Sequence, residues 1–192
     1  MALLNIHTRE IACKIVYYGT GLGGKTTNLK YIYSQLSPVT RTEMISLATE
    51  TERTLFFDYM GLDLGQVQGF KTKFSLYTVP GQVEYNSSRK LLLNGVDGII
   101  FVADSERIRQ KENIDSIQNM KENMLSVGIM PESIPIVLQY NKRDLAQVMT
   151  LNELENDLNP NNVPSFEAVA SDGLGVFATL RQISKLVLNR LQ

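Results

Sequence analysis

The stretch "YYGTGLGGKTTNLKY" (17–31) joins an apolar run to a segment with a helical pattern. It contains Gly19-x4-Gly24-Lys25-Thr26, the phosphate-loop pattern. Glycines let successive backbone N–H groups face one concavity, and the following helix directs the positive end of its dipole there. Lys25 adds a charge for the phosphates and the Thr26 hydroxyl suits Mg²⁺, whereas the alternative is a Gly-rich turn without a ligand. We expect nucleotide contacts from Gly19, Thr20, Gly21, Leu22, Gly23, Gly24, Lys25, Thr26 and Thr27.

The sequence around this loop alternates short apolar runs with helical patterns, which predicts an α/β fold. Strands are expected at 10–19, 97–105, 133–144 and 165–172, and helices at 25–36, 107–128 and 175–191. Residues 54–79 read as two extended segments, and the polar residues 37–54 read as a mobile loop. We therefore predict one domain over 1–192, with a mostly parallel sheet of six to seven strands and helices on both faces.

Composition and charge exclude several classes of function. The formal net charge of -1 gives no global field that would favour nucleic acid. A single cysteine, Cys13, excludes an intrachain disulfide, and a single histidine, His7, excludes a mechanism that needs a histidine pair. The strongly apolar run "GIIFVA" (98–103) is far too short to span a membrane. We expect a cytoplasmic protein without an integral membrane segment.

A second motif, "NKRD" (141–144), predicts which base the nucleotide carries. It follows a predicted strand, at the sheet edge where ligands bind in open α/β folds. The Asp144 carboxylate can accept two parallel hydrogen bonds, which guanine offers and adenine does not. Lys142 can lay its alkyl stem over the base, with Asn141 beside it. After the last strand, a backbone N–H of Ala170 or Ser171 can meet the guanine carbonyl, although an ordinary strand-to-helix turn is the alternative.

These motifs, with "PGQ" at 80–82, come in the order and spacing of the Ras-like small GTPases. Within them the chain resembles the bacterial MglA-type GTPases, which control gliding motility and cell polarity. The stretches that carry this closer likeness are "YYGTGLGGKTTNLKYIY" (17–33), "ATETERTLFFDY" (48–59), "TVPGQVEYNSSRKLLLNGVDGIIFVADS" (78–105) and "QYNKRDL" (139–145). The resemblance implies a Ras-like P-loop GTPase domain, with GTP or GDP and Mg²⁺ as cofactors, in which GTP holds two loops in an active shape.

The resemblance also implies roles for individual residues. Thr54 would sense Mg²⁺ and the γ-phosphate, and Gly81 would contact the nucleotide. Gln82 would orient the attacking water, and Arg53 would be an arginine finger supplied in cis. The implied activator is a homodimeric Roadblock-type protein of the MglB type. The implied effectors bind the GTP state and act in polarity or motility, and partners would bring the protein to a pole or a membrane.

One position departs from the Ras-like pattern. Thr78 stands where those proteins usually have an acid that contacts Mg²⁺ through water, although a threonine is normal for the MglA type. A threonine carries no charge, so another acid must supply it if the site is to hold Mg²⁺ equally well. Asp58, on the neighbouring extended segment, is the candidate metal residue together with Thr26 and Thr54. The alternative is that Asp58 is an exposed acid at a strand end.

Three functions remain open at this point. The first is a GTP-hydrolysing switch, slow without an activator. The second is a nucleotide-gated polar scaffold with little hydrolysis, against which Gln82 and Arg53 argue. The third is a phosphoryl-transfer enzyme, for which "NKRD" (141–144) would have no role. Tyr85, Leu91 or Leu92, after the "PGQ" motif, are either exposed anchors for partners or part of the core.

Overall fold

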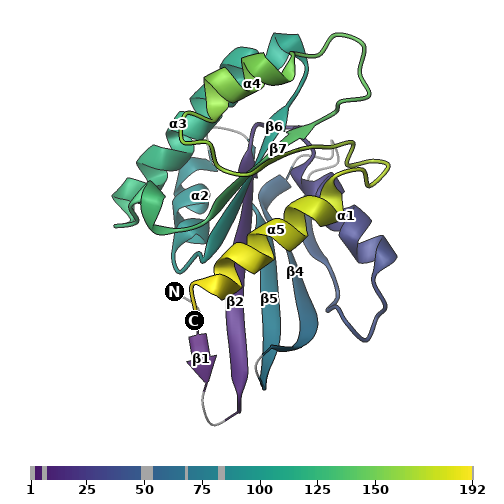
Figure 1. Ribbon diagram of the computed structural model, residues 1–192, viewed down its shortest axis with the longest axis vertical. Helices are drawn as coiled ribbons and strands as arrows, with labels where there is room; N and C mark the ends of the chain where they lie inside the picture. The colour runs from purple at the N-terminus through teal and green to yellow at the C-terminus, as the bar shows by residue number, and fades with distance from the viewer. Residues whose placement is uncertain (1–2, 6–7, 49–53, 68, 82–84, 192) are drawn as a thin grey trace.

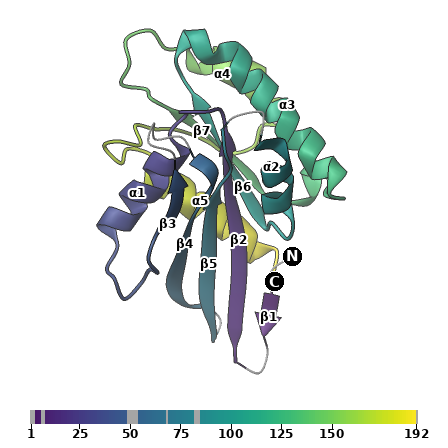
Figure 2. The same cartoon turned by 180° about the vertical axis from the view of Figure 1, so that it is seen from behind.

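The computed structural model describes residues 3–5, 8–48, 54–67, 69–81 and 85–191. The elements in chain order are β1 (Leu3–Asn5), β2 (Glu10–Gly19), α1 (Lys25–Gln35), β3 (Ile45–Ala48), β4 (Thr54–Val67), β5 (Phe70–Thr78), α2 (Asn86–Leu93), β6 (Gly98–Asp104), η2 (Arg107–Arg109), α3 (Gln110–Ser126), η3 (Pro131–Ser133), β7 (Ile136–Asn141), α4 (Leu151–Leu158), β8 (Ser165–Glu167) and α5 (Val176–Asn189). One sheet runs through the centre, with helices on both sides of it (Figures 1 and 2). The predicted α/β class is confirmed.

Within the described residues the sheet has eight strands, one more than the upper bound of the prediction. Seven lie in the order β3-β4-β5-β2-β6-β7-β8, and β1 pairs with β2 beside this path. Strand β2 is parallel to β5 and β6, and the parallel series continues through β7 and β8. The antiparallel pairs are β1–β2, β3–β4 and β4–β5. The parallel strands therefore all end at one edge of the sheet.

Strand β3 corrects the prediction that residues 37–54 form a loop throughout. Residues Ile45–Ala48 pair with β4, with Ser46 opposite Asp58. The segment before β3 also runs alongside β4, because the Thr42 N–H donates to Gly61 O at 2.9 Å. A four-residue edge strand with polar neighbours has no clear alternation, so its sequence pattern resembles a loop. Residues 49–53 of this segment lie outside the described residues.

Two hydrophobic cores cover the two faces of the sheet. Alternate residues of β2 point to opposite faces, so Ile15 and Tyr17 join one core and Val16 and Tyr18 the other. The first core packs under α1 and α5, and the second packs under α2, α3 and α4 (Figures 1 and 2). Cys13 is buried in the first core, where burial raises the pKa of its thiol to about 12 and keeps it unreactive.

The burial of apolar residues differs between α5 and α3. In α5 the apolar residues Val176, Leu180, Ile183 and Val187 are buried, and Phe177 is partly buried. In α3 the buried residues begin only at Asn113, and Ile108 and Ile114 are 84% and 40% exposed. Ile108 lies in the 3₁₀ turn η2 before α3, where the helical spacing does not yet apply.

Candidate nucleotide-binding site

The three predicted nucleotide segments meet at the carboxyl edge of the parallel strands. The phosphate loop, residues 19–26, starts at the last residue of β2, and Asn141–Asp144 start at the last residue of β7. Ala170 and Ser171 follow β8. Strands β2 and β7 both pair with β6, so their ends lie close together in Figure 1, next to the start of α1. This edge is where a doubly wound α/β sheet binds its ligand.

The phosphate loop has the form of an anion cradle. Helix α1 begins at Lys25 after Gly24, whose φ of 98° lies in the left-handed region, and no side chain caps its first N–H groups. Lys25 folds back so that its Nζ donates to Gly19 O at 3.1 Å and Thr20 O at 2.6 Å. Burial, together with the nearby positive charge of Arg89, lowers the pKa of Lys25 to about 7. A phosphate held here would offset that burial penalty by pairing with the ammonium group.

Asn141 joins the phosphate loop to the predicted base-binding segments. Its buried side chain donates from Nδ2 to Gly23 O and accepts at Oδ1 from the N–H of Ala170, both at 2.9 Å. The Ala170 N–H is thus engaged by Asn141 and does not face a ligand in this arrangement. Lys142, with a φ of 64°, pairs with the buried Asp104 at 2.6 Å. The Asp144 side chain, in contrast, is exposed and available to a base.

The substitution Gly24→Ala is expected to break this junction. A Cβ on Gly24 would lie 2.1 Å from Asn141 Nδ2, and its φ of 98° is strained for any L side chain. We expect the backbone strain alone to lower the free energy of unfolding, measured by urea denaturation, by about 1–3 kcal/mol. The clash with Asn141 would add to this loss. The control is Gly95→Ala, since Gly95 also has a positive φ but has no atom within 4 Å of a built Cβ. Equal losses in the two variants would contradict a role for the Asn141 contact.

Asp58 lies at the centre of a cluster of hydroxyl groups beside the phosphate loop. Its Oδ2 accepts from Thr26 Oγ1 at 2.6 Å and from Thr78 Oγ1 at 2.7 Å, and its Oδ1 accepts from Ser46. Its own N–H donates to Thr78 Oγ1 at 2.9 Å. The carboxylate is fully buried, so the alternative of an exposed strand-end acid is wrong.

These oxygen atoms fit a hard cation such as Mg²⁺. Within the described part of the chain, no group of three or more His, Cys, Asp or Glu side chains is placed to hold a metal ion. A cation near Thr26 would therefore depend on one carboxylate, Asp58, helped by hydroxyl groups. Thr54, the third predicted metal residue, lies at the start of β4, opposite Ala48 of β3.

The loop that follows β5 lies directly on the phosphate loop. A Cβ on Gly81 would come within 2.2 Å of Gly21 Cα, so only glycine fits at this contact. Arg89 of α2, 2% exposed, holds the segment by donating to Pro80 O at 2.9 Å and Gly81 O at 2.7 Å. Sequence reasoning missed Arg89, because a lone arginine in "NSSRKLLL" (86–93) gives no sign of burial.

Other predicted residues are only partly placed. Gln82 and Arg53 lie outside the described residues. Leu92 is buried at 7% exposure, as the core alternative expects, whereas Leu91 is 70% exposed and can serve as an anchor for a partner. Tyr85, which precedes α2, is half-buried.

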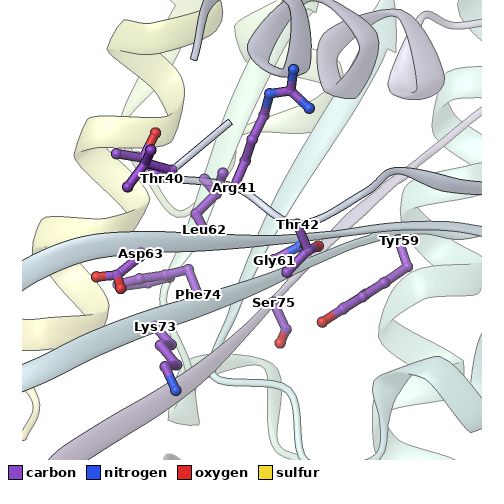
Figure 3. Close-up of a pocket in the computed structure, with 11 residues that line it drawn as sticks. Thr40, Arg41, Thr42, Tyr59, Gly61, Leu62, Asp63, Lys73, Phe74 and Ser75 are labelled. Atoms are coloured by element: carbon purple, nitrogen blue, oxygen red, sulfur yellow. The ribbon is translucent and has the colours of Figure 1, made fainter. Parts of the chain in front are cut away.

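A separate cavity of about 240 Å³ lies between the segment before β3 and the strands β4 and β5. Figure 3 shows Thr42 against Gly61, with Asp63 and Lys73 nearby on the two strands. The Thr42 hydroxyl accepts from the Gly61 N–H at 2.8 Å, and the Asp63 N–H donates to Thr40 O. This cavity is formed where the segment before β3 packs against β4. None of the residues that line it belongs to the nucleotide loops.

The fold and this edge of the sheet define a class: a P-loop nucleotide-binding protein with the motif order of the Ras-like small GTPases. Comparison with known proteins agrees. The sequence model of the ADP-ribosylation factor family matches residues 2–184. The chain is 54% identical over 192 residues to the mutual gliding-motility protein MglA of Myxococcus xanthus, covering 100% of this chain and 98% of the relative.

A more distant relative is ADP-ribosylation factor-like protein 6 of Caenorhabditis elegans. It is 27% identical over 168 residues, which cover 83% of this chain and 80% of that protein. The chain belongs to the ADP-ribosylation factor family and is a Ras-like small GTPase of the MglA type. In the described residues, no helix combines the length and apolar character needed to cross a membrane.

Proposed function

We propose that this protein is a GTP-hydrolysing switch that controls bacterial cell polarity and motility. The observation that supports it most is the Asn141 junction, which fixes the phosphate loop through Gly23 and the segment after β8 through Ala170. A site built this way recognises a phosphate and a base together, whereas a kinase of small molecules would not need Asp144. The relative MglA carries gliding motility in its name, which supports the cellular process.

In this proposal the described residues bind and orient the nucleotide. Lys25 and the N–H groups of the loop hold the phosphates, Asp144 and Ser171 read the guanine, and Lys142 lies along the base. Thr26, Thr54 and Asp58 would hold Mg²⁺, and the bound ion would neutralise phosphate charge. Gln82 orients the attacking water, and Arg53 supplies a positive charge to the transferring phosphoryl group.

Hydrolysis is proposed to be slow until a Roadblock-type homodimer of the MglB type binds. Intrinsic rates of Ras-like proteins are of the order of 10⁻⁴ s⁻¹, so such a switch waits for its activator. The test is multiple-turnover phosphate release from GTP, with and without the Roadblock partner. Release that stays at the intrinsic rate with the partner present would favour the polar scaffold with little hydrolysis.

Binding of GTP and ATP separates a guanine-nucleotide switch from a phosphoryl-transfer enzyme. We expect Asp144→Asn to weaken GTP binding by about 10²-fold or more, because the amide cannot accept both guanine donors. The same amide can donate to the carbonyl that xanthine carries in place of the amino group, so xanthosine triphosphate should bind better. Titration with fluorescent nucleotide analogues measures both changes.

The matched control is Asp115→Asn, which changes an acid that is 62% exposed on α3, in the Lys111 ion pair. It should bind GTP as the wild-type chain does. Equal affinity of the wild-type chain for GTP and ATP would refute the guanine assignment.

A further inference from the structure

Arg109, at the end of η2, contacts the phosphate loop from outside. Its Nη2 donates to Gly21 O at 2.7 Å, and its Nη1 pairs with Glu112 at 2.5 Å. Its Nε lies 3.8 Å from the buried Asp104, which also holds Lys142. Arg109 is about three-quarters buried, in the wall of a cleft of about 760 Å³ that reaches Thr20 and Gly21. The guanidinium is thus fixed on two sides while it holds one backbone carbonyl.

That carbonyl decides the orientation of the next amide. A trans peptide is planar, so its C=O and its N–H point in opposite directions. When Arg109 draws the Gly21 carbonyl toward the cleft, the N–H of Leu22 must point away from the cleft, to the inner side of the loop. N–H groups on the inner side are the ones that a phosphate loop offers to its anion. Arg109 therefore acts on the ligand through the peptide between Gly21 and Leu22.

The backbone conformation of Leu22 gives this peptide a conformational strain energy. Its φ of 60° is left-handed, although it is not a glycine, and its side chain is 61% exposed. Such a conformation costs about 1–2 kcal/mol for an L residue, and it persists only where neighbouring contacts impose it. The exposed leucine side chain supplies few contacts of its own. The hydrogen bond from Arg109 acts on the carbonyl of this peptide itself, in addition to the packing of Gly81 against Gly21.

We propose that Arg109 is a positioning residue that clamps the strained peptide between Gly21 and Leu22 in its nucleotide-binding orientation. This inference rests on the proposed function, since it assumes a guanine nucleotide in the loop. The clamp also links the two halves of the site, because Asp104 lies against Arg109 on the phosphate side and pairs with Lys142 on the base side.

The test measures dissociation of a fluorescent GDP analogue from the full chain. We expect Arg109→Ala to speed dissociation about tenfold, as the loss of one charge-assisted hydrogen bond would. Arg109→Lys, which keeps one charged donor, should recover part of the effect. The matched control is Arg107→Ala, from the same 3₁₀ turn, since Arg107 is 53% exposed and pairs with Glu153 of α4 at 2.7 Å. It should dissociate GDP as the wild-type chain does.

A second pair of variants separates a clamp from a general loss of structure. Leu22→Gly removes the strain, so Arg109→Ala in that background should speed dissociation by no more than about threefold. The unfolding midpoint of nucleotide-free Arg109→Ala should stay close to that of Arg107→Ala. Equal dissociation rates in Arg109→Ala and Arg107→Ala, or an undiminished effect beside Leu22→Gly, would overturn the clamp alone. A wild-type chain that holds no guanine nucleotide would overturn the proposed function, and the clamp with it.

Discussion

Replacing Arg53 by alanine is expected to leave GTP binding intact and to lower activator-stimulated hydrolysis by about 10³-fold or more. An arginine finger stabilises the charge that develops on the transferring phosphoryl group, and its loss removes that contribution from the transition state alone. Arg53 stands immediately before Thr54, the first residue of β4, in the sequence. We expect the finger to lie away from the phosphates until the activator binds.

Single-turnover phosphate release at saturating Roadblock partner measures the effect of Arg53→Ala. The control is Arg41→Ala, from the segment before β3. The Arg41 guanidinium is engaged elsewhere, because it lies over the Tyr33 ring at 3.3 Å and its Nε donates to Leu36 O at 3.1 Å. Arg41→Ala should keep stimulated turnover within a few-fold of the wild-type rate. Normal stimulated turnover in Arg53→Ala would refute the finger role.

The parts of the candidate site whose position in the fold could be predicted from the sequence are those built from contiguous residues. The phosphate loop needs glycines, a lysine and a helix start in a fixed order, so the printed sequence contains almost all of its geometry. The same holds for Asn141–Asp144, which lie at the carboxyl end of β7 as predicted. The alternation of strands and helices predicts that strands such as β2 and β7 are parallel, which brings their carboxyl ends to one edge of the sheet.

The remaining contacts join residues that are far apart in the sequence. Arg109 and Gly21 are 88 positions apart, and Arg89 reaches Gly81 from another element. Neither arginine stands in a recognisable motif, and their burial depends on how α2 and α3 pack against the sheet. Strand β3 is short and lies at an edge, so the sequence pattern gives little sign of a strand there. Its pairing with β4 is what identifies it as a strand.

Asp58 shows how strand register decides a role that the sequence left open. Tyr59 pairs with Tyr77 across β4 and β5, which places the neighbouring Asp58 and Thr78 side by side on the same face. A slip of one residue would turn the carboxylate to the other face of the sheet. The sequence identified the acid as a candidate, but only the register, together with Ser46 on β3, brings it to Thr26.

Asp58→Asn is accordingly expected to raise the Mg²⁺ concentration needed for half-maximal nucleotide retention by about tenfold or more. The amide keeps the shape of the side chain but removes the charge that Thr78 does not supply, and hard cations depend on carboxylate oxygens. Titration of Mg²⁺ against GDP dissociation measures the change. The control is Asp63→Asn, which removes an acid from the same strand that pairs with Lys71 at 3.0 Å on the surface.

The charge, rather than Asp58 itself, should be what the site needs. Thr78→Asp in the Asp58→Asn background returns one carboxylate to the same hydroxyl cluster, from β5 instead of β4. It should therefore lower part of the way back the Mg²⁺ concentration needed for half-maximal nucleotide retention. Thr78→Asp alone places two carboxylates side by side in a buried cluster, so it should destabilise the nucleotide-free protein, while Mg²⁺ offsets that repulsion. An unchanged Mg²⁺ titration in Asp58→Asn would refute the metal role. A failed recovery with Thr78→Asp would instead show that the position of the carboxylate on β4 matters as much as its charge.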